Sequence, residues 1–99
     1  MKIQVSKEFE KSARRLSGKH LQSLRNMIQE VCDASSIQDL TDCKKLSGLE
    51  NIYRIRVGDY RAFFSHIEVT DECVRFLYLC SRGQAYDKKM IERFKSADA

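Results

Sequence analysis

Three arginines on a predicted β-hairpin are the residues of this chain whose types and spacing point most clearly to chemistry. In the stretch KKLSGLENIYRIRVGDYR, Arg54 and Arg56 precede a turn at Gly58 and Asp59, and Arg61 follows it. Side chains alternate between the faces of a strand, so the three guanidinium groups are expected on one face, with Arg56 opposite Arg61. Like charges directly opposite one another are unfavourable, and a bound polyanion would compensate them. The alternative interpretation is that the arginines are solvated on the exposed side of a half-buried sheet.

The turn predicts the hairpin that positions these arginines. A two-residue loop that begins with glycine suits a type II′ turn, whose twist matches that of the flanking strands. This loop predicts three further pairs across the strands, Val57 with Tyr60, Ile55 with Ala62, and Tyr53 with Phe64. The same six residues form a continuous apolar face, which other parts of the chain must cover.

Two helices are predicted before the hairpin. Residues 2–5 alternate and suit a short first strand, after which Ser6 is a suitable helix N-cap. Gly18 marks the end of the first helix, and a second apolar stripe at helical spacing covers residues 19–34. We expect the two helices to form an antiparallel pair that packs on the apolar face of the sheet.

The second half of the chain adds a buried strand and a final helix. Residues 73–80 (CVRFLYLC) are apolar at nearly every position, as expected for a strand inside a sheet. Periodicity does not decide whether Phe76 and Tyr78 or Leu77 and Leu79 face the helices. After this strand, Asp87 can cap a helix with a small apolar face at Met90, Ile91 and Phe94. The order is strand, helix, helix, three or four strands, helix, which is an α+β fold.

Composition and charge indicate a single soluble domain over residues 1–99. The 18 lysines and arginines exceed the 14 acidic residues, for a net charge of +4, which favours nucleic acid or an acidic protein as partner. No apolar run is long enough for a signal sequence or a membrane span, so we expect a cytoplasmic protein without a membrane partner. The cysteines lack the spacing of a metal site, and we expect reduced thiols at Cys32, Cys43, Cys73 and Cys80.

Three features occur together in this sequence: the hairpin stretch at residues 44–61, the apolar strand after it, and Arg82 followed by Tyr86. In these features the sequence resembles the RelE/ParE toxin superfamily of bacterial toxin-antitoxin systems. The resemblance implies a twisted antiparallel sheet of about four strands, two N-terminal helices on one face, a concave basic surface on the other, and a short C-terminal helix. For RelE-like members it implies a ribosome-dependent endoribonuclease that cuts mRNA in the A site and inhibits translation. The implied partners are the ribosome, mRNA and a cognate antitoxin that wraps the basic face.

The resemblance also implies roles for particular residues. Arg56 and Arg61 would bind the scissile phosphate, Arg54 would position the backbone, Arg82 would support the leaving group, and Tyr86 would stack on a base or transfer a proton. Guanidinium forks suit the charge that grows on phosphoryl oxygens when the neighbouring 2′-hydroxyl attacks, without a metal or other cofactor. RNA contacts are also expected from Phe63 and from Lys44 and Lys45, the two lysines as peripheral phosphate contacts or else as solvated charges. Because Arg61 is expected to be exposed, Arg61→Ala is expected to remove toxicity with little loss of stability.

The general base and the target stay open at this point. RelE-type enzymes have lysines where this chain has Arg54 and Arg56, and arginine hardly deprotonates in proteins. Tyr86, ribosomal RNA or a hydroxide ion are candidates for the base, whereas strand parity places His66 on the apolar side. Two other functions fit the same resemblance, a non-enzymatic ParE-like toxin that binds DNA gyrase, and an inactive homologue that acts only in the antitoxin complex.

Overall fold

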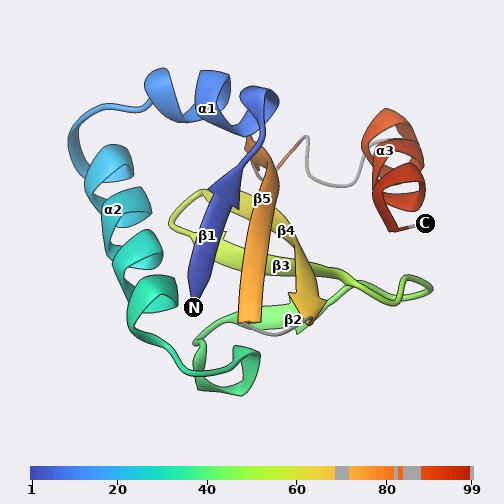
Figure 1. The fold of residues 1–99 in the computed structure, drawn as a ribbon. Helices are drawn as coiled ribbons and strands as arrows, with labels where there is room; N and C mark the ends of the chain where they lie inside the picture. The colour runs from blue at the N-terminus through green and yellow to red at the C-terminus, as the bar shows by residue number, and fades with distance from the viewer. Residues whose placement is uncertain (69–71, 82, 84–87, 99) are drawn as a thin grey trace.

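The computed structural model describes residues 1–68, 72–81, 83 and 88–98 as a five-stranded sheet with helices on both faces. Figure 1 shows α1 and α2 on one side of the sheet and α3 on the other. The strands are β1 (Lys2–Val5), β2 (Cys43–Lys45), β3 (Ile52–Val57), β4 (Tyr60–Glu68) and β5 (Glu72–Ser81). The helices are α1 (Lys7–Arg14), α2 (Gly18–Asp33), α3 (Lys88–Asp98) and a 3₁₀ turn η1 (Ile37–Asp39).

The sheet is mixed, with strand order β1-β5-β4-β3-β2. The α+β class and the order of elements are confirmed, but the expectation of about four antiparallel strands is corrected in two respects. There are five strands, and β1 pairs with β5 in parallel, with Ile3 beside Val74. A parallel pair requires a long connection, here most of the chain, and no local pattern in the sequence shows which strand β1 meets.

The central hairpin has the predicted register. Arg56 pairs with Arg61, and the other three predicted pairs are also present. Gly58 has a φ of 58°, whereas Asp59 is not in the positive region, as a type II′ turn requires. The turn therefore fixes which side chains share a face.

The helix face, defined as the side of the sheet under α1 and α2, holds the larger core. Ser6 begins α1, because its Oγ accepts a hydrogen bond from the Phe9 backbone N–H at 3.1 Å and donates one to the Leu77 carbonyl at 2.6 Å. Phe9 thereby packs on Phe76, with 5.1 Å between ring centroids. The buried members of this core are Phe9, Leu16, Leu24, Met27, Val31, Leu40, Ile55, Val57, Ala62, Phe64, Val74, Phe76 and Leu79.

The two N-terminal helices are not the antiparallel pair that the sequence predicted. Figure 1 shows α1 across one end of β5 and α2 running down the side of the sheet, at a wide angle to α1. The chain turns between them before Gly18, which has a φ of 55° and is the first residue of α2. Each helix therefore packs separately on the sheet.

The opposite side carries the three arginines of the hairpin, and we call it the arginine face. Part of it is covered by α3, which packs Met90 and Phe94 against Ile52, Phe63 and Cys80. On β5, Phe76 and Leu79 belong to the helix face, whereas Leu77 and Tyr78 pack on the α3 side. An irregularity in the pairing of β4 with β5 between Phe63 and Phe64 accounts for this change of alternation. Among the described residues, no helix has the length and apolar character needed to cross a membrane.

Candidate functional site

Two pairs of like charges lie next to each other on the arginine face. Arg56 stands opposite Arg61 across β3 and β4, and Lys44 stands opposite Arg54 across β2 and β3. Strands β2 and β3 contain no acidic residue, with sequences CKK and IYRIRV. Each such pair weakens the sheet slightly, so their repetition on neighbouring strands favours a site for an anionic ligand.

Arg61 is buried rather than exposed. Its side chain is 8% exposed, and Nη1 donates to the carbonyl oxygens of Gly58 at 3.2 Å and Tyr60 at 2.9 Å. The guanidinium folds back over the hairpin turn and satisfies backbone acceptors there. The expectation that Arg61 lies on an exposed surface is therefore wrong. With the side chain buried and bonded in this way, we instead expect its removal to destabilise the hairpin turn.

Arg56 is the exposed member of its pair. It lies next to the turn, where it also borders a cavity of about 240 Å³ between α2 and the hairpin, together with Ser23, Asn26 and Glu30. Its backbone N–H donates to the Asp42 carbonyl at 3.4 Å, which continues the pairing of the strand beyond β2. The backbone of Arg56 is thus held at the sheet edge, and its side chain can reach a ligand in solvent.

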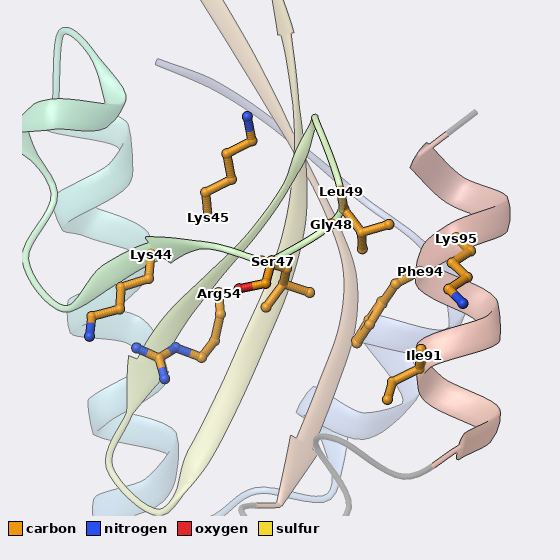
Figure 2. Close-up of a pocket in the computed structure, with 10 residues that line it drawn as sticks. Lys44, Lys45, Ser47, Gly48, Leu49, Arg54, Ile91, Phe94 and Lys95 are labelled. Carbon is orange, nitrogen blue, oxygen red and sulfur yellow. The ribbon is translucent and has the colours of Figure 1, made fainter.

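Arg54 lines a cavity of about 350 Å³ between the β2–β3 connection and α3. Figure 2 shows it with Lys44 and Ser47 on one side and the side chains of α3 on the other. Lysines at three positions surround this cavity, and aliphatic and aromatic groups form much of its wall. Among the residues that the structure describes, those that line it are Lys44, Lys45, Leu46, Ser47, Gly48, Leu49, Arg54, Ile91, Phe94 and Lys95.

Cys43 lies next to Lys44 on β2, but its side chain is a protonated thiol and therefore not a nucleophile. Burial raises its pKa to about 11, with Arg54 opposing the rise and Glu30 adding to it. Since the thiolate is the reactive form, Cys43 is inert at neutral pH. All four cysteines are free, as expected, and the described residues hold no cluster of three or more metal-ligating side chains.

The sequence is 35% identical over 88 residues to the toxin RelE3 of Methanocaldococcus jannaschii, with 88% of this chain and 97% of that toxin covered. The chain belongs to the RelE toxin family. The expected membership of the RelE/ParE superfamily is thereby confirmed. No protein-family model matches the sequence.

Solved structures of RelE proteins have the same fold. A RelB–RelE antitoxin–toxin complex from Methanococcus jannaschii is similar with a TM-score of 0.68 and 29% identity, covering 86% of this chain and 96% of that one. An archaeal RelE–RelB complex from Pyrococcus horikoshii OT3 gives a TM-score of 0.67 and 26% identity, covering 85% and 97%. Both structures contain a RelE chain together with RelB.

The residues expected from the RelE resemblance do not all meet on one open surface. Arg54, Arg56, Lys44 and Lys45 lie along β2 and β3, with both lysines exposed. Phe63 is 0% exposed, and its ring lies 4.4 Å from that of Phe94. The prediction that Phe63 contacts RNA is corrected, because α3 covers it. Arg82 and Tyr86 fall outside the described residues.

The sequence pattern did not indicate the groups that α3 brings to this face. Lys95 and Ile91 border the cavity beside Arg54, as do Leu46 and Leu49 of the β2–β3 connection. Two leucines within a short polar connection were a signal that this segment packs against another element. The apolar residues of the final helix were recognised, but their spacing does not say which face of the sheet they cover.

Proposed function

We propose that this chain is the toxin of a type II toxin-antitoxin system and that it cleaves mRNA in the ribosomal A site. The identity with RelE3 over nearly the whole of that toxin supports the toxin role. The RelB–RelE complexes among its structural relatives support a cognate antitoxin as partner. Residues 1–99 are proposed to form one toxin domain that works in the cytoplasm and needs no cofactor.

The observation that best supports a nuclease is that two pairs of like charges lie next to each other on β2, β3 and β4. Attack of a 2′-hydroxyl on the neighbouring phosphorus forms a 2′,3′-cyclic phosphate and releases a 5′-hydroxyl. Negative charge grows on the phosphoryl oxygens during this step, and fixed guanidinium groups stabilise it. Arg56 is exposed and can contact the phosphate directly, whereas Arg61 holds the turn that positions it. Arg54, Lys44 and Lys45 line the path of the RNA backbone.

The proton acceptor is not an arginine, because a guanidinium stays protonated at any physiological pH. Cys43 is also unsuitable, since burial raises its pKa to about 11. Tyr86, a ribosomal group or hydroxide remain the candidates in this proposal, and Arg82 is proposed to support the leaving oxygen. A base supplied by the ribosome would make cleavage depend on the ribosome.

The test is to add the purified chain to programmed ribosomes and to map new 5′ ends of the mRNA by primer extension. We expect cuts within the A-site codon, none on free mRNA, and 5′-hydroxyl ends. An mRNA with 2′-deoxyribose before the scissile phosphate should resist cleavage, because it lacks the nucleophile. Cleavage of the deoxy mRNA would contradict the 2′-hydroxyl mechanism.

Gyrase binding is the second candidate, because Arg54 and Arg56 stand where RelE-type enzymes carry lysines. Intact mRNA on ribosomes, together with inhibition of gyrase supercoiling by the same preparation, would establish it. Failure of both assays would leave the third interpretation, a homologue that acts only in its antitoxin complex.

A further inference from the structure

The side chain of Glu30 connects α2 to the segment that enters β2. One carboxylate oxygen accepts a hydrogen bond from the Thr41 backbone N–H at 2.8 Å, and both oxygens accept from the Thr41 hydroxyl at 3.0 Å. Hydrogen bonds to an ionised acceptor are stronger than those between neutral groups. In Figure 1 the chain leaves α2, passes through η1 and enters β2 at the edge of the sheet. Glu30 therefore fixes the end of this connection relative to α2.

Asp42, the residue after Thr41, is held in an uncommon backbone conformation. Its φ is 53°, a value that non-glycine residues seldom adopt unless their surroundings maintain it. In this conformation the Asp42 carbonyl accepts a hydrogen bond from the Arg56 backbone N–H at 3.4 Å. Because that bond is long, it depends on Asp42 staying in place. Asp42 is kept there by its two neighbours, the anchored Thr41 and Cys43, which pairs with Ile55.

Arg56 depends on this carbonyl because β2 is short. The pairing of β2 with β3 extends as far as Cys43 opposite Ile55, and Arg56 is the next residue along β3. On its other side, Arg56 pairs with Arg61 of β4. The Asp42 carbonyl thus holds the outer side of β3 at the residue whose side chain is proposed to reach the phosphate.

Glu30 and Thr41 also border the cavity of about 240 Å³ that Arg56 lines between α2 and the hairpin. Glu30 is the only acidic residue among the described residues of this lining. A carboxylate that paired with Arg56 would compete with a phosphate for the guanidinium. Both oxygens of Glu30 instead accept from Thr41, and no salt bridge joins Glu30 to Arg56 in the described part of the chain. The Thr41 hydroxyl therefore leaves the guanidinium for an anionic ligand.

We propose that Glu30 and Thr41 are positioning residues for mRNA cleavage, which act by holding the Arg56 backbone where its guanidinium meets the scissile phosphate. The inference rests on the proposed function, because it concerns the arginine assigned there to the phosphate. Neither residue contacts the RNA. A shift of β3 at Arg56 moves the guanidinium with it, and a displacement of about 1 Å at a reacting site can lower the rate roughly 100-fold.

The test measures single-turnover cleavage on programmed ribosomes over a range of toxin concentrations. Glu30→Ala should lower the maximal rate by about tenfold or more, whereas the concentration that gives half of this rate should change by less than about twofold. Glu30→Gln keeps an oxygen that accepts from Thr41, and its rate should stay within about threefold of that of the unchanged chain. Glu10→Ala removes an exposed carboxylate of α1 and should change the rate by less than about twofold. Cleavage by Glu30→Ala at the rate of the unchanged chain would overturn the proposal.

A double-mutant cycle tests whether Glu30 acts through Arg56. In a chain that already carries Arg56→Ala, the further change Glu30→Ala should alter the rate by less than about twofold, because no guanidinium is left to position. A loss of about tenfold in both backgrounds would show that Glu30 supports the fold in general, and the proposal would fail.

Thr41 provides a second pair of variants, which decides the question even if Glu30→Ala does not fold. Thr41→Val removes the hydroxyl at nearly constant shape and should slow cleavage by about threefold or more, whereas Thr41→Ser keeps the hydroxyl and should stay within about twofold of the unchanged chain. Equal rates for the two variants would overturn the proposal.

Exchange of the Arg56 amide proton, followed by NMR, reports on the same link without cleavage. Glu30→Ala should accelerate exchange at Arg56 by about tenfold and leave exchange at Arg54, which pairs with Lys44 of β2, within about twofold. Equal acceleration at both amides would overturn the proposal.

The unchanged chain distinguishes the two possible failures. If it cleaves mRNA and Glu30→Ala cleaves as fast, the positioning role alone is removed. If it cleaves no mRNA, the proposed function fails and the positioning role fails with it, and faster exchange at Arg56 then shows only that Glu30 holds the strand.

Discussion

On the helix face, Phe9, Phe64 and Phe76 pack ring against ring under α1, whereas on the arginine face Phe63 and Phe94 pack beside a cluster of cations. The helix face is sealed by two helices from the start of the chain. The arginine face is only partly covered, by one helix from the end of the chain. The first face buries the larger part of the core, and the second carries the proposed binding surface together with unfavourable charge pairs.

The largest expected effect is on the helix face. Phe76→Ala should lower the free energy of unfolding by about 3 to 5 kcal/mol, because the ring is 0% exposed and contacts both Phe9 and Phe64. Urea denaturation followed by circular dichroism measures the change. A loss below about 1 kcal/mol would mean that the helix face is not the main core.

Phe94→Ala tests the other face with the same substitution. We expect local release of α3 rather than global unfolding, since the Phe94 ring packs on Phe63 and Tyr78 and the helix is at the end of the chain. Hydrogen exchange should accelerate in α3 and leave the amides of β4 and β5 protected. If the whole sheet loses protection, the two faces form one cooperative unit and the contrast between them fails.

The pair Arg56 and Arg61 separates binding from stability within one face. Arg61→Ala should cost about 1 to 3 kcal/mol, because it leaves the carbonyls of Gly58 and Tyr60 without their charged donor. Arg56→Ala should change stability by less than about 0.5 kcal/mol, because that side chain is exposed. Thermal melts measure both. Equal melting temperatures for the two variants would contradict the assigned difference in burial.

The last expected effect concerns Cys43, which packs against the core of the helix face. Burial raises its pKa to about 11 from the usual 9.0, so the folded state holds the thiol proton more tightly than the unfolded state. Its contribution to stability is complete below pH 9 and is lost as pH rises from 9 to 11. Cys43→Val should flatten this alkaline decline in a series of urea titrations. A decline of the same slope in Cys43→Val would show that other groups cause it.

The features of the two faces that depend on short-range sequence patterns could be predicted from the sequence. Gly58 and Asp59, with alternating apolar and polar residues directly on either side, are enough to fix the register of the hairpin and therefore which residues accompany Arg56. Ser6 marks the start of α1 correctly, because capping depends on the next three residues. Family membership also followed from the hairpin, since this stretch carries most of the resemblance.

The missing parts depend on contacts between distant segments. Phe63 is buried because α3 returns to it from about 30 residues further along the chain, and alternation alone shows it on the same side as the arginines. Arg61 is buried because its long side chain folds back over its own turn, which a face assignment does not describe. The parallel pairing of β1 with β5 could likewise not be predicted, because the local sequence of several strands is compatible with pairing to β1.

The central claim is that the exposed arginine of the hairpin pair stabilises the phosphate during cleavage. The most direct measurement is the single-turnover rate of A-site cleavage on programmed ribosomes by Arg56→Ala, with Arg25→Ala on the outer surface of α2 as control for the loss of one positive charge. We predict a fall of about 100-fold or more for Arg56→Ala at unchanged melting temperature, and a change within about twofold for Arg25→Ala. Cleavage by Arg56→Ala at the rate of the unchanged chain would contradict the account.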